Sequence, residues 1–320
     1  MEQQIQQQNN SAKYAFFYML SLVSLAFTAT CVGVVVFQII NKLIPDAVNF
    51  YQGRFEPDAL KFSIAAIIIA APIYYLTSWQ INKSLRSGAL LKDAAVRRWL
   101  TYFILFVASV TMIGWFIRTI YNFLDGEMTV KFILKAVTAI FIAAAVFSYY
   151  FFDIRRDKVE EKDRIIKIYF FASLILVIAS LTAAFVYSPT PAETRAKRQD
   201  NETLNRFNMI DNAINSYYAE KKKMPENLKE LIGGNKYLID SRYIKDAVSG
   251  EEFSYKILSD KKSYELCAKF QSSNRTNDNM MDDYMRDRWP HDAGYKCINQ
   301  GIYSLDDVKG GILPIPRPID

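Results

Sequence analysis

Histidine and cysteine are scarce in this chain. Proteins often use these two residue types to bind metals or to act as nucleophiles and bases. Its 320 residues include one histidine, His291, and three cysteines. A tetrahedral zinc site needs four ligands of these kinds, so we expect no metal and no cofactor. His291, in the segment RWPHDAG, is expected to be a structural or surface residue rather than a catalytic base.

Recognisable catalytic motifs are also absent from the sequence. It contains no nucleophile elbow, no phosphate-binding glycine loop and no zinc-protease helix, so we do not expect an enzyme. Pairs of aspartates at 282–283 and 306–307, together with Asp246, leave a weak calcium site as an alternative to solvated loop residues.

Charged residues are rare in five apolar segments, each long enough to form a helix across a hydrocarbon core about 30 Å thick. The segments are residues 14–44, 60–81, 99–124, 132–152 and 165–187. Buried helices of soluble proteins rarely reach this length without a polar stripe, so the pattern predicts a bundle of five transmembrane helices. The first segment is longer than a signal peptide's apolar region, and Cys31 within it is expected to be a buried thiol.

The excess of positive charge belongs entirely to the apolar half. Up to Pro191 there are 18 Lys and Arg against 12 Asp and Glu, whereas the remainder has 21 of each. A basic patch on a soluble domain is therefore missing, which argues against nucleic-acid binding.

The same charges predict an orientation in the membrane. The second and fourth connecting segments hold eleven Lys and Arg, against four at the first and third. Because cytoplasmic loops are enriched in these residues, we expect the N-terminal tail, residues 1–13, to be cytoplasmic. The chain after Tyr187 is then extracytoplasmic, and the protein is expected in the cell (inner) membrane of a bacterium.

Packing signals occur within the apolar segments. Pro72 is expected to kink the second helix, because its ring displaces a backbone hydrogen bond. Small residues four positions apart allow helices to approach closely, and two such pairs occur, Ala29 with Gly33 and Ala139 with Ala143.

Arg118, in WFIRTIYNFLDGE, is the notable charge within an apolar segment. Charges at such depth are costly and often functional. Its long side chain is nevertheless expected to reach the interface or to pair with acidic residues in the following loop. A transport or gating role for Arg118 is the alternative.

Two prolines mark the change from an apolar to a polar sequence. Pro189 and Pro191 prevent the fifth helix from continuing, and residues 188–193 are expected to be a linker. Apolar residues at helical spacing then predict a long amphipathic helix over residues 194–221. EFSYKIL and SYELCAKF, joined by SDKK, predict a β-hairpin that covers this helix.

Two of the three cysteines, Cys267 and Cys297, lie in the polar half. On the oxidising side of a membrane such a pair is more often a disulfide than two thiols, so we expect a bridge. In the chain-entropy model it contributes roughly 3 kcal/mol. A metal site is the rival interpretation, but it lacks ligands. The last segment, residues 304–320, is rich in proline and expected to be extended.

Two parts of the chain resemble known families. Residues 14–156, including RRWLTYFILFVASVTMIGWFIRTIYNFLDGEMTVKFILKAV, resemble the bacterial multi-pass membrane family called domain of unknown function 5671. This resemblance implies a multi-pass membrane protein and no activity. NRFNMIDNAINSYYAEKKKMPENLKELI, DAVSGEEFSY and YELCAKF are similar to the globular part of type II secretion pseudopilins. That similarity implies an α+β domain over residues 194–303.

The pseudopilin pattern is incomplete, since no prepilin-peptidase site precedes the fifth helix and four other helices come before it. We therefore expect a five-helix α-helical transmembrane bundle that anchors an extracytoplasmic pilin-like domain for interaction or scaffolding. The expected partners are the lipid bilayer and another cell-envelope protein or a second copy of the chain. A small transporter or channel subunit that uses Arg118 is the alternative.

Overall fold

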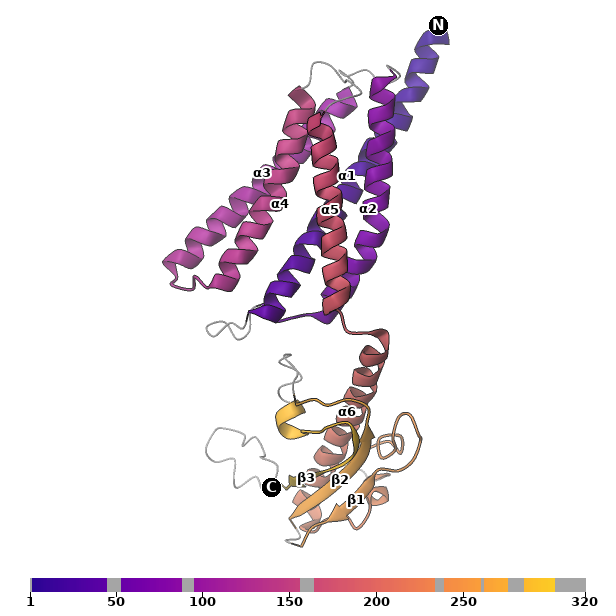
Figure 1. Cartoon of the computed structure of the whole chain (residues 1–320). Coiled ribbons are helices and arrows are strands. Elements are labelled where there is room, and N and C mark those ends of the chain that lie inside the picture. Colours follow the sequence, from indigo (N-terminus) through magenta and orange to yellow (C-terminus); the bar gives the residue numbers. More distant parts are fainter. Residues whose placement is uncertain are drawn as a thin grey trace. The chain divides into compact units, whose positions relative to one another are not determined.

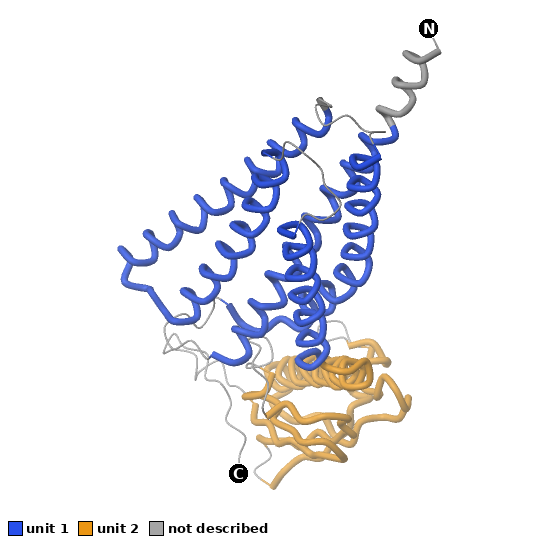
Figure 2. The backbone as a smooth tube through the Cα atoms, turned by 45° about the horizontal axis from the view of Figure 1, so that its top comes forward, with its two compact units in different colours: residues 1–188 blue, residues 189–320 orange. Residues whose placement is uncertain are grey.

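The computed structural model describes residues 2–44, 53–87, 95–155, 164–233, 239–259, 262–275 and 285–302. The chain divides into two compact units, Met1–Ser188 and Pro189–Asp320, coloured separately in Figure 2. Each unit has its own buried core. We call them the membrane unit and the polar unit and describe each by itself.

The membrane unit consists of five helices, each long and apolar enough to cross a bilayer, as the sequence predicts. They are α1 (Glu2–Leu43), α2 (Pro57–Arg86), α3 (Ala95–Leu124), α4 (Val130–Arg155) and α5 (Arg164–Tyr187) (Figure 1). Helix α1 begins at Glu2, so the segment expected to be a separate tail is helical. Its Gln-rich sequence favours helix and contains no proline or glycine.

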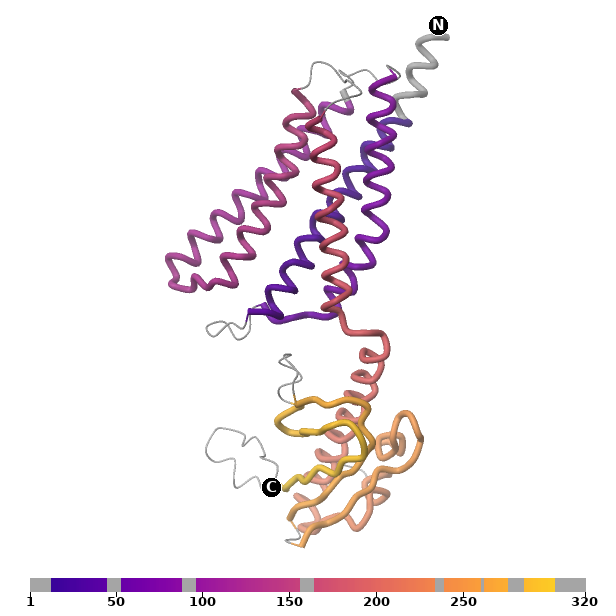
Figure 3. The backbone as a smooth tube through the Cα atoms, viewed as in Figure 1, coloured from indigo at the N-terminus to yellow at the C-terminus, as the bar shows by residue number. Residues whose placement is uncertain are grey.

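Helix α1 is the centre of the membrane unit, because it contacts each of the other four helices. Helices α3 and α4 pair as a hairpin on one side of it, while α2 and α5 contact each other as well as α1 (Figure 3). The buried core lies on the side of α2 and α5, where Val35 of α1 packs with Leu60 of α2 and Ala184 of α5.

The outward faces of these helices are covered with large apolar side chains. Phe106, Ile117 and Leu124 of α3 are 64%, 63% and 77% exposed. A soluble protein rarely leaves a contiguous apolar surface of this kind in water. With five helices long and apolar enough to cross a bilayer, this surface indicates a membrane protein.

The polar unit combines one long helix with a small sheet. The helix is α6 (Pro191–Lys221), followed by a 3₁₀ turn, η1 (Leu228–Leu231). Strands β1 (Ser254–Ile257), β2 (Ser263–Phe270) and β3 (Gly294–Gly301) form an antiparallel sheet in the order β1-β2-β3. Helix α6 buries an apolar stripe that includes Phe207, Ile210 and Ile214 against Leu266 and Phe270 of the sheet.

The predicted hairpin corresponds to β1 and β2, but the sequence analysis missed β3. Strand β3 has weak apolar alternation, since Tyr295 and Cys297 are exposed while Ile298 and Gln300 are buried. It pairs with β2 along its whole length, from Ser263 opposite Gly301 to Phe270 opposite Gly294. The expected domain therefore has three strands rather than a hairpin alone.

Helix α6 starts at Pro191, three residues before its expected first residue, so the linker between α5 and α6 is short. Thr190 is the N-cap: its hydroxyl accepts from the Glu193 backbone N–H at 3.2 Å, and the Glu193 carboxylate accepts from the Thr190 N–H at 2.8 Å. This capping box satisfies two backbone donors. Proline fits directly behind it, because a residue in the first turn needs no intrahelical N–H bond.

Candidate functional site

Four helices of the membrane unit line a small polar chamber near the ends joined by the α2–α3 and α4–α5 connections. Its volume is about 30 Å³, which is room for one or two water molecules. We define the polar chamber by its polar lining residues: Tyr18, Ser21, Ser78, Asn82, Thr101, Tyr149, Tyr150 and Asp153. Helices α1, α2, α3 and α4 all contribute to it.

An ion pair closes one side of the polar chamber. The Arg97 guanidinium donates to the Asp153 carboxylate at 3.0 Å and to the Asp153 backbone carbonyl at 3.0 Å. The two side chains are only 6% and 15% exposed. Because α3 begins beside the end of α4, the two charges neutralise each other where neither is well hydrated.

A pair of hydroxyl groups joins two further helices. The Ser21 hydroxyl of α1 and the Ser78 hydroxyl of α2 lie 3.4 Å apart. In lipid a polar side chain has no water to bond with, so such groups are paired within the protein. These contacts join α1 to α2 and, through Arg97 and Asp153, α3 to α4.

Tyrosine hydroxyls attach α5 at the same level. Tyr75 of α2 donates to Ser173 of α5 at 3.1 Å, and Tyr169 of α5 donates to Ser148 of α4 at 3.1 Å. All five helices are thus tied by polar side chains near one end of the unit. None of these residues was singled out by the sequence analysis.

A larger, apolar cavity adjoins the polar chamber. We call it the groove; its volume is about 390 Å³ and its walls come from α1, α3 and α4. Leu22 and Ile104 line both cavities, so the groove and the chamber are neighbours. The polar residues in its lining are Thr30 and Thr111, and the remaining lining residues are apolar.

The small-residue pairs of the sequence analysis lie beside this groove. Ala29 and Gly33 of α1 and Ala139 and Ala143 of α4 all line it. A Cβ atom at Gly33 would lie 3.6 Å from the Ile142 side chain, an ordinary contact. The small residues therefore bring α1 and α4 together and also leave an open apolar space next to their contact.

Arg118 lines neither the groove nor the polar chamber. Its side chain is exposed and its guanidinium lies 5.7 Å from the centre of the Trp115 ring. The expected reach of Arg118 toward the interface and its alternative role in transport both stay predictions. Pro72 lies inside α2 on an exposed face, and Pro189 and Pro191 flank the Thr190 cap.

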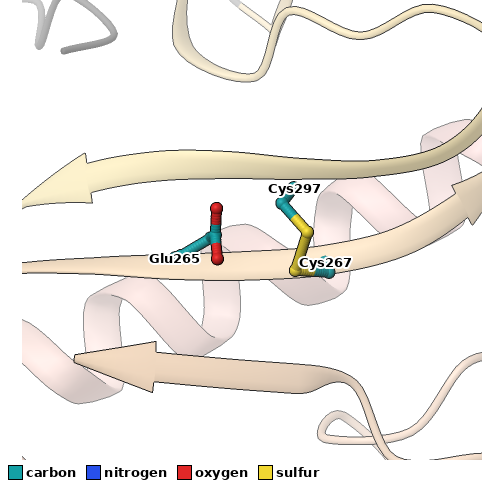
Figure 4. A group of neighbouring side chains, drawn as sticks. All are labelled: Glu265, Cys267 and Cys297. Carbon is teal, nitrogen blue, oxygen red and sulfur yellow. A yellow bond between two sulfur atoms is a disulfide. The ribbon is translucent and has the colours of Figure 1, made fainter. Parts of the chain in front are cut away.

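In the polar unit, Cys267 and Cys297 are joined by a disulfide (Figure 4). They occupy directly paired positions of β2 and β3, on the face of the sheet away from α6. Glu265 lies beside them, with a carboxylate oxygen and the two sulfur atoms within 4.8 Å of one another. Thiolates are the metal ligands, so this group is not a metal site while the disulfide is formed.

A buried carboxylate accepts hydrogen bonds from several parts of the polar unit. Asp211 of α6 is fully buried and accepts from the Tyr264 hydroxyl of β2, from Arg288 and, at 3.2 Å, from Asn215. Burial raises the pKa of the Asp211 carboxyl, although Arg288, Tyr264 and Asn215 each act to lower it. Its partners come from three parts of the unit, which indicates a structural role.

His291 is buried and stacks on the Phe270 ring at 3.8 Å. Its Nδ1 lies 3.0 Å from the Trp289 carbonyl, so Nδ1 carries the proton. Burial lowers the pKa of His291 from 6.5, against smaller opposing effects of the Trp289 carbonyl and Asp200.

Among the aspartates considered for a calcium site, Asp246 accepts from the N–H groups of two following residues and closes a turn. Positions 282–283 and 306–307 lie outside the described residues.

Comparison with known proteins relates the membrane unit to one protein family. No curated protein and no solved structure matches the chain. Residues 14–150 match the family described as Domain of unknown function (DUF5671). This region contains most of α1 to α4, and with them the groove and all of the polar chamber except Asp153. Residues 14–150 of the membrane unit therefore form a DUF5671 domain.

Proposed function

We propose that the protein is a membrane-anchored interaction protein, in which the membrane unit holds the polar unit at the surface of a bacterial inner membrane. The polar unit then recognises another component of the cell envelope on the extracytoplasmic side. The observation that carries this proposal is that a separate unit follows the five apolar helices in the sequence. This polar unit has its own buried core and a disulfide. Such a unit has the rigidity that a recognition surface needs.

Two independent features support an extracytoplasmic position. Lys and Arg are concentrated in the second and fourth connections of the membrane unit, which cytoplasmic loops favour. Disulfides persist in oxidising compartments and are rare in the cytosol, and the polar unit contains the Cys267–Cys297 disulfide. Both features support the same proposed orientation.

The face of the sheet away from α6 is the proposed recognition surface. It presents Glu265 and Lys269 from β2 and Tyr295 and Asn299 from β3, around the disulfide. Tyr295 is 63% exposed, and tyrosine is enriched among the residues that dominate binding energy in interfaces. A long helix packed on the other face of an antiparallel sheet also supports the similarity of this unit to pseudopilin globular domains.

Cysteine labelling tests the orientation. In a Cys31→Ser background, Asp125→Cys at the α3–α4 turn and Ser87→Cys after α2 introduce exposed thiols at opposite ends of the membrane unit. A membrane-impermeant maleimide should label position 125 in intact cells and position 87 only after the membrane is opened. The reverse pattern would place the polar unit in the cytoplasm and refute the proposal.

Site-specific photo-crosslinking tests the recognition surface. A photoreactive residue at Tyr295 should give a discrete adduct in cells with an envelope protein or a second copy. The matched position is Met209, which is 46% exposed on α6, and it should give much less of that adduct. If both positions return only the monomer, the interaction role is wrong.

A further inference from the structure

We propose that the membrane unit holds one anionic phospholipid. One acyl chain occupies the groove, an ester carbonyl or glycerol oxygen reaches the polar chamber, and the phosphate lies among cations at the adjoining helix ends. This inference concerns the membrane unit alone and does not depend on what the polar unit recognises.

The shape and lining of the groove fit a single hydrocarbon chain. On α1 its lining runs from Leu22 to Phe37, which is about 22 Å along a helix that rises 1.5 Å per residue. A bilayer core is about 30 Å thick, so this length matches a chain that enters from one leaflet and passes the midplane. The volume of about 390 Å³ lies within the range of small-molecule sites.

The polar chamber lies at one end of this apolar path. Leu22 and Ile104 are shared by both cavities, and beyond them the lining changes to hydroxyl and amide groups. With about 30 Å³, the chamber has room for one small polar group. The charges of Arg97 and Asp153 already balance each other, so a neutral oxygen suits the chamber better than a charged group.

The helix ends around the chamber are basic. Four exposed cations lie there: Lys83 and Arg86 in the last turn of α2, Arg98 in the first turn of α3, and Arg155 at the end of α4. The ammonium of Lys83 lies 5.2 Å from the centre of the Trp79 ring, and the guanidinium of Arg155 lies 4.1 Å from that of Phe151.

Tryptophan side chains such as Trp79 mark the level of lipid headgroups. Basic residues at the ends of transmembrane helices attract anionic lipids. The charge at this end of the unit therefore favours an anionic phospholipid over a neutral one, and over an uncharged apolar ligand such as a second transmembrane helix.

Lipid retention by the full-length protein tests the proposal. Native mass spectrometry of the chain in a mild detergent should show about one phospholipid per chain. Ala29→Leu and Ala143→Leu fill the groove and should reduce the bound fraction at least fivefold. Matched controls are Ala65→Leu and Ala172→Leu, at exposed positions of α2 and α5 outside the groove, and these should retain the lipid. Equal retention by all five proteins, or a bound polypeptide instead of lipid, would overturn the proposal.

A fluorescence measurement tests the same proposal without the groove-filling leucine variants. Trp115 lines the groove; replacing Trp79 and Trp99 by Phe removes the other tryptophans of the membrane unit. In nanodiscs of phosphatidylcholine, a small fraction of phosphatidylglycerol with a brominated acyl chain should quench Trp115 to saturation. Brominated phosphatidylcholine at the same fraction should quench weakly. Equal, non-saturating quenching by the two lipids would show ordinary lipid contact and refute a specific site.

Discussion

Arg97 in the first turn of α3 binds both the carboxylate and the backbone carbonyl of Asp153 in the last turn of α4. The carbonyl is one of the last four of α4, which have no partner within their helix. Truncating one member of a buried ion pair leaves the other charge uncompensated and costs about 3–5 kcal/mol. We therefore expect Arg97→Ala to lower the thermal unfolding temperature of the detergent-solubilised chain by many degrees.

An exposed arginine elsewhere in the membrane unit provides the control, since Arg164→Ala at the start of α5 removes the same charge outside the pair and should have little effect. The double variant Arg97→Met/Asp153→Leu should recover most of the lost stability, because apolar replacement of a buried pair is often neutral. If Arg97→Ala and Arg164→Ala unfold at the same temperature, the ion pair has no structural importance.

Removal of the disulfide should destabilise the polar unit selectively. The bridge spans a sequence separation of 30 residues, and a loop of that length corresponds to about 3 kcal/mol in the chain-entropy model. Cys297→Ser should increase amide hydrogen exchange in α6 and β2. Cys31→Ser, which replaces the buried free cysteine of α1, should leave exchange in those segments unchanged. Unchanged exchange in Cys297→Ser would contradict the prediction.

The start of α6 depends on its capping box. Thr190→Ala removes a side-chain acceptor for the Glu193 N–H, and loss of an N-cap typically costs about 1 kcal/mol. The first turn of α6 should then exchange its amide protons roughly fivefold faster, while Thr190→Ser should behave like the native chain. Equal exchange in both variants would show that Pro191 alone fixes the helix start.

Stability of the polar unit should fall as the pH drops below about 6.5. The folded-state pKa of His291 is lowered, so the unfolded chain binds a proton at a higher pH than the folded chain does. The neutral ring therefore contributes fully to the free energy of unfolding above the pKa of His291 in the unfolded chain, about 6.5. This contribution is lost as the pH falls from there toward the lower pKa of the folded chain. Its Nε2 is buried without a hydrogen-bond partner among the described residues, which explains why a second proton is unfavourable.

Replacement of the imidazole isolates this effect. His291→Gln lacks a titrating ring, so exchange protection around Trp289 should change less between pH 7.5 and pH 5.5 than in the native chain. A variant with the same pH response as the native chain would assign the loss of stability to other groups.

The sequence predicted the parts of the fold that depend on long, regular patterns. Five uninterrupted apolar segments predicted five helices, and the stripe through Phe207 and Ile214 predicted the buried face of α6. Strand β3 was missed because its exposed Tyr295 and Cys297 obscure the alternation on which strand prediction depends.

The polar chamber was missed for a different reason. Its residues are single serines, tyrosines and an asparagine spread over four helices, and only tertiary packing brings them together. Arg97 and Asp153 were counted with the connecting segments, whereas the structure places them in the terminal turns of α3 and α4. The periodicity of residues within one helix carries no information about an ion pair that forms between two helices.

The central position of α1 affects how the membrane unit assembles during synthesis. This helix is synthesised before α2, α3, α4 and α5, yet its contacts are with these four helices. Its side facing α4, with Ala29 and Gly33, and its side facing α5 therefore meet lipid or insertion factors until the later helices arrive. Ribosomal pausing or truncation before α5 would leave α1 integrated in the bilayer without its contacts to α5.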